Sequence, residues 1–425
     1  MTPHYDLALP RAVIEAVLSG RVGRERLWSG PAGISDQGDT VEWLAPRLTA
    51  WGMADAEGPL VLARVTPDLP DPADWVGVLA QAGLEAAVTV VGLGLTPAGA
   101  ASAWVRTAGD WQPVRRLRLV GRGMHCLSLT EPAEVAPDPA DSDRWSRVIG
   151  ALSLPVWQRL RGLHYAVIGV GRAGSLLATS LARLGARRLT LIDPDRVEPH
   201  NLDAMDGVYP ADVGRFKVEV VAEHLRRIGG PALIVTPLPH GLTTPPALSA
   251  VRAAEVFLCA VDDERTRLAA GILATLYLRP LLDIGGGVLR DDAGQLVPGG
   301  DIRLILPDEG RCLWCFGGLS QAARSPALLR TSEPPAPWQQ LRAGSLRSVN
   351  QINAHVGLRL LEAMVAESGG SVWLRLEEAE GIPQLVNQTP PPAFQCPLCA
   401  KELGRGDAGL GRLLALAEGL LGGTL

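Results

Sequence analysis

The sequence lacks the features of a membrane, secreted or nucleic-acid-coating protein. Its longest apolar runs, such as residues 87–95, fall well short of the ~20 residues that a membrane helix needs. The N-terminus shows no charged region followed by an apolar core, so no secretory signal is visible. The formal net charge of −5 argues against nucleic acid or a membrane surface as a partner. We therefore expect a cytoplasmic globular protein.

Lysine is nearly absent. It occurs only as Lys217 and Lys401, so 38 of the 40 basic residues are arginine. Together with 48 glycines and 34 prolines, this bias is typical of a GC-rich genome. A lysine that is present against this bias is therefore a candidate for a specific role. The chain is nonetheless 425 residues long and 47% hydrophobic, enough for a sizeable core and two or three domains at ~150 residues each.

Cysteine is sparse too, but its placement forms a pattern. Four of the six cysteines make two Cys-x-x-Cys pairs, Cys312/Cys315 and Cys396/Cys399. In a large chain without a secretory signal, such pairs indicate thiolate metal ligands rather than disulfides. Four thiolates suit tetrahedral Zn²⁺, and without a fifth cysteine or a nearby histidine the site would be structural. The alternative is two unrelated thiol pairs or redox sites.

The second part of the chain alternates strands with amphipathic helices. The expected strands are 165–170, 188–193, 232–238, 256–261 and 281–284, and the expected helices are 175–184, 218–227 and 265–277. After a Pro/Ser-rich stretch at 325–338, a helix over 351–366 and antiparallel strands over 372–376 and 383–387 follow. This alternation predicts an α/β fold with a mostly parallel sheet that is covered by helices on both faces.

The first part of the chain mixes short apolar runs with turn residues. It predicts strands over 59–65 and 85–91 and helices over 10–18 and 73–82. Residues 132–142 are rich in proline and acidic residues, which is typical of a linker. We therefore predict a smaller N-terminal α/β domain over 1–131, a linker over 132–142 and a larger domain over 143–425.

A glycine loop marks a nucleotide site in the larger domain. Gly169, Gly171 and Gly174 form a G-x-G-x-x-G pattern between a predicted strand and a predicted helix. In this loop the first glycine permits a tight turn, the second lets the backbone approach a phosphate, and the third lets helix and strand pack closely. Asp193 ends the next strand, where a carboxylate would bind a ribose. The pattern leaves open a dinucleotide, ATP or a mere packing turn.

Further segments resemble the ThiF/MoeB/HesA family, the bacterial members of the ubiquitin-activating enzyme superfamily. They are Asp143-Arg-Trp-Ser-Arg147, Leu191-Ile-Asp-Pro-Asp-Arg-Val-Glu-Pro-His-Asn-Leu202, Asp212-Val-Gly-Arg-Phe-Lys-Val-Glu219, Cys259-Ala-Val-Asp-Asp-Glu-Arg-Thr-Arg267 and the two cysteine pairs. The resemblance covers about 143–400. It implies a Rossmann-like ThiF/MoeB-type adenylation domain with a mostly parallel central sheet and structural zinc.

The resemblance also implies a reaction and a role for each matching residue. The C-terminal carboxylate of a ubiquitin-like or sulfur-carrier protein, ending in glycine, would attack the α-phosphorus of ATP and give an acyl-adenylate and pyrophosphate. Two anions must meet, so charge neutralisation and alignment supply most of the catalysis. Asp193 would hold the ribose, Asn201 the sugar or phosphates, Lys217 the phosphates and Asp262 a Mg²⁺ ion. Arg147 would reach the γ-phosphate, usually from the partner subunit, which implies a homodimer.

Each of these roles has a plainer alternative. Lys217 could be a solvated residue at the start of a helix, Asp262 a helix cap, and Arg147 one surface arginine among 38. One departure from the family also matters, because Ala204 stands where the family usually has an arginine. Arg215 or Arg172 could substitute for it. Without such a substitute, the chain could instead be a non-catalytic, activating-enzyme-like scaffold that binds a small protein.

A third function class, an NAD-dependent oxidoreductase, fits the glycine loop but gives no reason for the lysine. The superfamily members that pass their carrier to a cysteine keep it after the first zinc knuckle, and residues 316–395 contain none. Cys259 lies in an apolar run, where a thiol should be inert, and only Cys126 is uncommitted. We therefore predict that the reaction stops at the acyl-adenylate, which an external nucleophile then accepts.

The N-terminal domain resembles a degenerate JAB/MPN isopeptidase domain. The active form needs a His-x-His-Pro motif for zinc, and the matching run here is Arg64-Val-Thr-Pro67, with neither ligand position occupied by histidine. The resemblance therefore implies a domain that cannot hold catalytic zinc in the usual way, although Asp74 remains. The alternative is an unrelated α/β domain.

Overall fold

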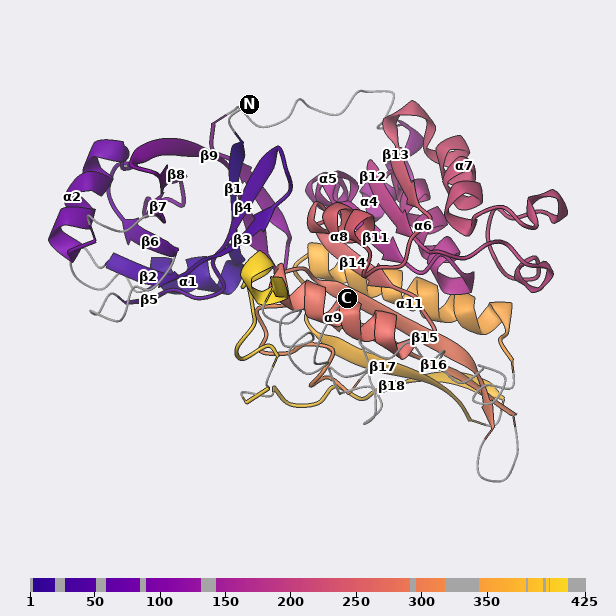
Figure 1. Cartoon of the computed structure of the whole chain (residues 1–425). Helices are drawn as coiled ribbons and strands as arrows, with labels where there is room; N and C mark the ends of the chain where they lie inside the picture. The colour runs from indigo at the N-terminus through magenta and orange to yellow at the C-terminus, as the bar shows by residue number, and fades with distance from the viewer. Residues whose placement is uncertain are drawn as a thin grey trace, which may run out of the picture.

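The computed structural model describes residues 3–19, 27–50, 59–84, 89–130, 143–290, 296–317, 344–379, 381–392, 395–396 and 398–411. These residues form two sheets that lie side by side, one from the first 130 residues and one from residue 143 onward (Figure 1). The predicted linker at 132–142 and the stretch at 325–338 lie outside the described residues. The domain boundaries themselves stay a prediction. None of the helices in the described part combines the length and apolar character that a membrane crossing requires.

The N-terminal sheet is mixed and has the order β3-β4-β1-β9-β8-β7-β6-β2-β5, with β10 paired to β9. Its strands are β1 (His4–Pro10), β2 (Leu27–Pro31), β3 (Gly33–Asp36), β4 (Thr40–Leu44), β5 (Thr49–Ala50), β6 (Leu60–Val65), β7 (Thr89–Leu95), β8 (Ala101–Thr107), β9 (Asp110–Val120) and β10 (His125–Ser128). Helices α1 (Arg11–Ser19) and α2 (Pro72–Ala82) pack on it. The start of α2 is well specified, because the Asp71 carboxylate accepts the amides of Ala73 and Asp74 at 2.8 and 3.0 Å.

The C-terminal sheet has the order β13-β12-β11-β14-β15-β16-β17-β18. The strands are β11 (His164–Ile168), β12 (Arg188–Ile192), β13 (Ile234–Leu238), β14 (Val256–Cys259), β15 (Leu281–Arg290), β16 (Leu296–Ile305), β17 (Val372–Ala379) and β18 (Ile382–Asn387). The five from β13 to β15 are parallel, and β16, β17 and β18 extend the sheet in antiparallel fashion. The predicted α/β class and the antiparallel pair are confirmed.

Helices cover this sheet, as the alternating pattern predicts. They are α4 (Ser146–Leu152), α5 (Leu154–Gly162), α6 (Arg172–Leu184), α7 (Lys217–Gly229), α8 (Pro245–Arg252), α9 (Glu264–Leu276) and α11 (Arg347–Val365). Short 3₁₀ turns η1 (Pro199–Asn201), η2 (Pro210–Asp212) and η3 (Gly230–Ala232) join them. In α6 the apolar stripe of Leu176, Leu177 and Leu181 is buried against the sheet, because these residues recur on one helix face.

Buried charges connect the two sheets. The Glu42 carboxylate on β4 accepts hydrogen bonds from Arg118 on β9 at 2.6 Å and from Arg279, between α9 and β15, at 2.6 Å. Arg118 also lies 3.4 Å from Glu255, just before β14. Glu42, Arg118 and Arg279 are all buried, so this cluster is an interior part of the fold rather than a surface ion pair.

Residues 400–407, which we call the strap, run from the second cysteine pair to the N-terminal sheet. Arg47 donates to the Ala400 carbonyl at 3.1 Å, and Gly406 forms a β-bridge with Ile34. The Asp407 carboxylate accepts the Asp36 amide at 2.8 Å and the Tyr277 hydroxyl at 2.7 Å. The strap therefore contacts both sheets.

Candidate functional site

The glycine loop lies where β11 ends and α6 begins, at the carboxyl ends of the parallel strands, the usual ligand edge of such a sheet. Gly169 has φ = +84°, and a Cβ on it would lie 2.7 Å from Val261. A Cβ on Gly174 would lie 1.9 Å from the Gly169 carbonyl oxygen. Around Gly171, by contrast, a Cβ would meet nothing within 4 Å among the described atoms. The loop is thus tight at its first and third glycines and open at its second.

Asp193 lies beside this loop and holds it. Its carboxylate accepts the amide of Val170 at 2.7 Å and the amide of Asp195 at 2.9 Å. The side chain is nearly buried, and burial raises the pKa of the carboxyl group in spite of the nearby Lys217 ammonium. Asp193 therefore shapes the crevice as well as offering an acceptor to it.

Lys217 opens α7 and points at carboxylates of the same crevice. Its Nζ lies 2.8 Å from the Asp195 carboxylate, and its side chain is only 12% exposed. Burial acts to lower its pKa, but the charges of Asp193, Asp195 and Asp262 outweigh burial and raise it, so the ammonium stays charged. A solvated helix-start lysine would not show this environment. Asp195 is a further residue of this site, and the Asp-Pro-Asp run after β12 is its signal in the sequence.

Asp262 follows β14 and is exposed on the same edge of the sheet. The cap of α9 is the next residue, because the Asp263 carboxylate accepts the amides of Arg265 at 3.1 Å and Thr266 at 2.8 Å. The alternative that Asp262 caps the helix is therefore wrong, because Asp263 is the N-cap of α9. Asp262 acts on the pKa of Lys217, so the two lie in one electrostatic site.

Asn201 ends η1 and is nearly buried. Its Oδ1 accepts the Glu198 amide at 2.9 Å, which fixes the turn that carries the segment 199–206 past the glycine loop. Arg172, in the loop, donates to the neighbouring His200 carbonyl at 2.8 Å. The structure thus brings the segment of Asn201 next to the glycine loop. A contact of Asn201 with the sugar or phosphates stays a prediction.

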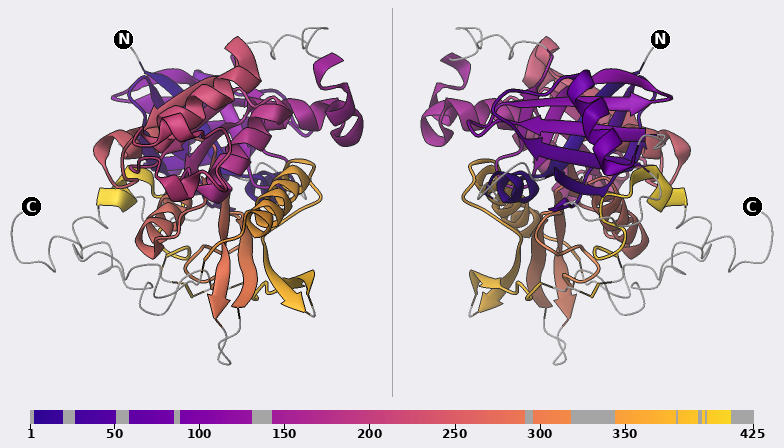
Figure 2. Two further views of the ribbon diagram at one scale, coloured as in Figure 1. Left: turned by 90° about the vertical axis from the view of Figure 1, so that its right-hand side faces the viewer. Right: turned by 90° about the vertical axis from the view of Figure 1, so that its left-hand side faces the viewer.

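Arg147 does not join this group within its own chain. It is exposed on α4, a helix without a buried side chain, and Trp145 beside it packs on Gly185, at the end of α6. Because α6 has 13 residues, that end lies about 20 Å from the glycine loop. Figure 2 shows α4 projecting from the side of the molecule.

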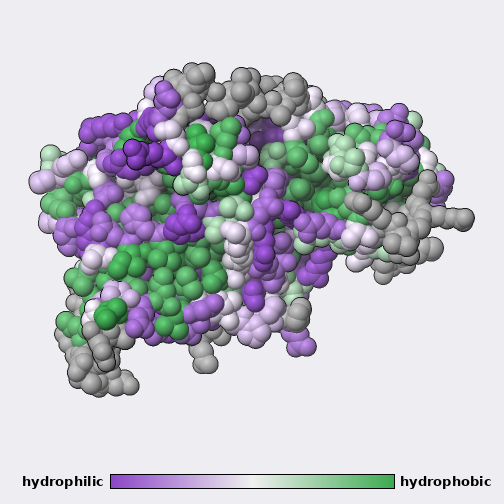
Figure 3. All heavy atoms as spheres, turned by 180° about the vertical axis from the view of Figure 1, so that it is seen from behind, coloured by the Kyte–Doolittle hydropathy of each residue, from purple (hydrophilic) through white to green (hydrophobic). Residues whose placement is uncertain are grey.

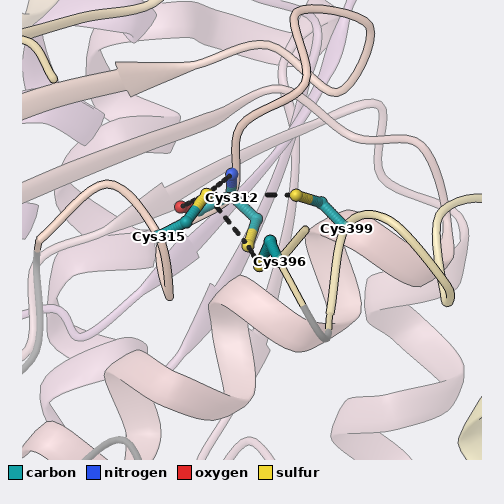
Figure 4. Close-up of side chains that lie close together, drawn as sticks. All are labelled: Cys312, Cys315, Cys396 and Cys399. Atoms are coloured by element: carbon teal, nitrogen blue, oxygen red, sulfur yellow. Dashed lines mark hydrogen bonds between the residues drawn. The ribbon is translucent and has the colours of Figure 1, made fainter. Parts of the chain in front are cut away.

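The four paired cysteines come together into one cluster, although Cys312 and Cys396 are 84 residues apart (Figure 4). The Sγ atom of Cys312 lies 3.9 Å from that of Cys315 and 3.6 Å from that of Cys396, and the Sγ atoms of Cys315 and Cys399 are 3.9 Å apart. Four sulfurs at ~2.3 Å from a tetrahedral zinc are about 3.8 Å apart. The cluster could therefore bind zinc, and three of its four residues are buried, as a closed structural site requires.

The N-terminal sheet holds no comparable site in the part of the chain that the structure describes. Arg64 lies on β6, and Thr66 uses its hydroxyl to bond the Asp68 carbonyl at 2.6 Å. Asp74 completes the cap of α2 by accepting the Asp71 amide at 2.9 Å. The residues of the degenerate motif thus serve the local fold, and the JAB/MPN resemblance stays a prediction.

Residues 145–335 match the ThiF family. The chain carries a ThiF-family domain. Ubiquitin-like modifier-activating enzyme 5 from Gallus gallus is 26% identical over 224 residues, which cover 49% of this chain and 54% of the relative. Adenylyltransferase and sulfurtransferase uba4 from Aspergillus terreus is 31% identical over 150 residues, 35% of this chain and 30% of the relative. The matches to the enzyme 5 relatives thus span about half of their length.

Solved structures of E. coli MccB are also similar to this chain. The complex with AMPCPP and MccA has a TM-score of 0.48 and 17% sequence identity, and the match covers 61% of this chain and 75% of that one.

Proposed function

We propose that this protein uses ATP to adenylate the C-terminal carboxylate of a ubiquitin-like or sulfur-carrier protein. One observation carries the proposal: the glycine loop, Asp193, Lys217 and Asp262 meet at one edge of a ThiF-family sheet. Adenylyltransferase chemistry has support at the level of the family, and a relative bears that activity in its name.

In this reaction the chain would bind ATP, align it with the carboxylate of the carrier and neutralise the phosphate charge. The open space at Gly171 and the start of α6 suit phosphate oxygens, because the first amides of a helix point outward and carry partial positive charge. Lys217 would neutralise phosphate charge, and Asp193 would accept a hydrogen bond from the ribose. Asp262 would hold Mg²⁺, whose chemistry when bound is to offset phosphate charge. Neutralisation matters most because the carboxylate and the phosphates repel each other.

We also propose a homodimer in which Arg147 completes the site of the partner subunit. Its distance from its own glycine loop and the projection of α4 support this arrangement. A second feature is the apolar groove between α11 and β18, lined by Ile352, Val356, Leu360 and Leu385. Figure 3 shows this hydrophobic area over α11, β17 and β18. Large exposed apolar areas of this kind mark protein interfaces.

The test is ATP–pyrophosphate exchange with candidate carriers that end in glycine. We expect exchange that depends on the carrier and on Mg²⁺. The alternative, a non-catalytic scaffold, is favoured by Ala204 and predicts carrier binding without exchange. Binding of NAD without any binding of ATP would instead support an oxidoreductase and would remove the proposal.

A further inference from the structure

The proposed site raises a question of charge balance. Lys217 lies on the Asp193 side of the crevice, next to three carboxylates, which already offset its positive charge. The segment 199–206, which Arg172 links to the glycine loop, carries Ala204, a buried methyl group that cannot contact phosphate. ATP carries several negative charges, so a further cation of the same chain near the glycine loop would strengthen binding of the polyphosphate.

Two of the arginines near the crevice are committed elsewhere. Arg215 donates to Asp212 at 2.8 Å and to Glu223 of α7, on an exposed surface. Arg196 stacks over the ring of Phe216 at 3.9 Å and donates to the Gly214 carbonyl. Neither guanidinium forms a contact with the glycine loop.

Arg172 is different, because it belongs to the loop itself. It follows Gly171, where open space surrounds the backbone, and it is the first residue of α6. Its guanidinium crosses to the segment 199–206 and lies 2.8 Å from both the His200 carbonyl and the Asp203 carboxylate. The Arg172 side chain is 22% exposed, whereas that of Asp203 is 62% exposed. An ion pair open to solvent on one side is weak and can be displaced by a phosphate.

The segment that Arg172 reaches is also held from behind. Arg347, at the start of α11, donates to the Ala204 carbonyl at 2.5 Å and to Asp206 at 2.7 Å. These contacts hold the backbone of the segment in place and occupy the Arg347 guanidinium. Arg172 therefore remains the cation placed between the loop and the segment.

We propose that Arg172 binds the β- and γ-phosphates of ATP, supplying from the glycine loop the positive charge that Ala204 cannot supply from the segment. This inference rests on the proposed function. On binding, the guanidinium exchanges the Asp203 carboxylate for phosphate oxygens, which it can bind with two parallel N–H donors. Asp203 then acts as a competitor that holds the guanidinium in place when no nucleotide is bound.

The experiment compares the binding of ATP and of adenosine by calorimetry, with Mg²⁺, to the full chain and its variants. We expect Arg172→Ala to weaken ATP binding roughly tenfold to a hundredfold and to leave adenosine binding nearly unchanged. Arg172→Lys should lie between, because it keeps the charge but loses the fork. Arg215→Ala is the matched control, since it removes an arginine that is paired with Asp212 and Glu223, and it should bind ATP as wild type does.

A second variant keeps the inference testable if Arg172→Ala does not fold. Asp203→Asn removes the competing charge, so ATP binding should tighten several-fold while adenosine binding stays the same. Equal ATP affinity of wild type, Arg172→Ala and Asp203→Asn would overturn the role of Arg172 and leave the proposed function standing. Absence of ATP binding by the wild-type protein would instead overturn the proposed function, and the role of Arg172 with it.

Discussion

The two lysines of the chain lie in opposite environments. Lys217 is mostly buried against Asp195, with Asp193 and Asp262 near enough to raise its pKa, whereas Lys401 is exposed in the strap. In a composition that otherwise uses arginine, a compact ammonium at this place fits a point contact to phosphate, where the planar fork of arginine is not required.

Lys217→Ala should therefore reduce carrier-dependent ATP–pyrophosphate exchange by about 10²-fold or more, because it removes an aligned charge that acts on the transition state. The fold should survive, since the ion pair that the variant loses joins Lys217 to Asp195, whose side chain is mostly exposed to water. Lys401→Ala is the matched control and should be as active as wild type. Circular dichroism checks the fold of both variants, and equal exchange rates for them would refute the role of Lys217.

His164 gives a pH dependence whose sign follows from its surroundings. Its Nε2 lies 2.9 Å from the Thr190 hydroxyl, and burial lowers its pKa to about 4. An unfolded histidine has a pKa of about 6.5, so between about pH 6.5 and pH 4 the unfolded chain binds a proton that the folded chain does not. The contribution of His164 to stability is present above pH 6.5 and is lost as the pH falls through that window.

We expect His164→Asn to flatten the loss of stability between pH 6.5 and pH 4 in urea titrations. His4→Asn, at an exposed histidine of the N-terminal sheet, is the matched control and should follow the wild-type curve. Parallel curves for all three proteins would show that His164 titrates normally in the folded state.

Cys126 is the one thiol outside the cluster that lies on the surface, on β10. Partial burial of its thiol and the charge of Glu255 raise its pKa against the opposing effect of Arg118. A thiol with a raised pKa is a poor nucleophile at neutral pH. We expect no thiol-sensitive carrier adduct on non-reducing gels, and an adduct that disappears in Cys126→Ala would overturn this prediction.

At the scale of elements, the cysteine cluster holds the strap. Metal binding to a closed four-thiolate site supplies folding energy, so removing the metal should loosen the chain on either side of it. The strap contains two trypsin sites, Lys401 and Arg405, whose cleavage reports that loosening.

We expect about one zinc per chain and faster trypsin cleavage after Lys401 and Arg405 when the metal is chelated, read by mass spectrometry of the fragments. Cys396→Ser should show the same cleavage without chelator, whereas Cys126→Ser should not. Protein that contains no zinc, or a strap that resists trypsin equally with and without chelator, would contradict this assignment.

The parallel strands could be predicted from sequence because each is a short apolar run between turn residues, buried on both faces. Strand β16 could not, since Pro298, Gly299 and Gly300 are typical of a turn. These glycines lie in a strand because α11 packs so closely that a Cβ on Gly300 would be 2.1 Å from Asn353. Close packing between elements distant in sequence leaves no local signal.

The candidate site also has a part that the sequence predicts and a part that depends on packing. Its glycines, Asp193, Lys217 and Asp262 follow strands or open helices, so their position along the chain already places them at one edge of the sheet. The cap of α9 by Asp263 and the pairing of Lys217 with Asp195 depend on turn geometry at the level of single residues. The distance between Arg147 and the glycine loop of its own chain depends on how α4 packs, and the spacing of residues in the sequence does not predict that packing.

At the scale of the whole molecule, a site that two subunits share makes a test by complementation possible. Lys217→Ala and Arg147→Ala homodimers should each be nearly inactive. When the two chains are co-expressed, half of the dimers are mixed, and each mixed dimer has one complete site. We expect exchange activity to recover to roughly a quarter of wild type, whereas no recovery would show that Arg147 does not act across an interface.

The buried cluster of Glu42, Arg118, Glu255 and Arg279 constrains how this protein can evolve. Its charges come from both sheets, and removing one partner of a buried ion pair costs about 3–5 kcal/mol. A substitution at Glu42 takes this partner from both Arg118 and Arg279, so we expect the three positions to be strongly epistatic. Recombination that exchanges the first 130 residues between distant homologues would break such pairs, so the two halves should be inherited as one unit.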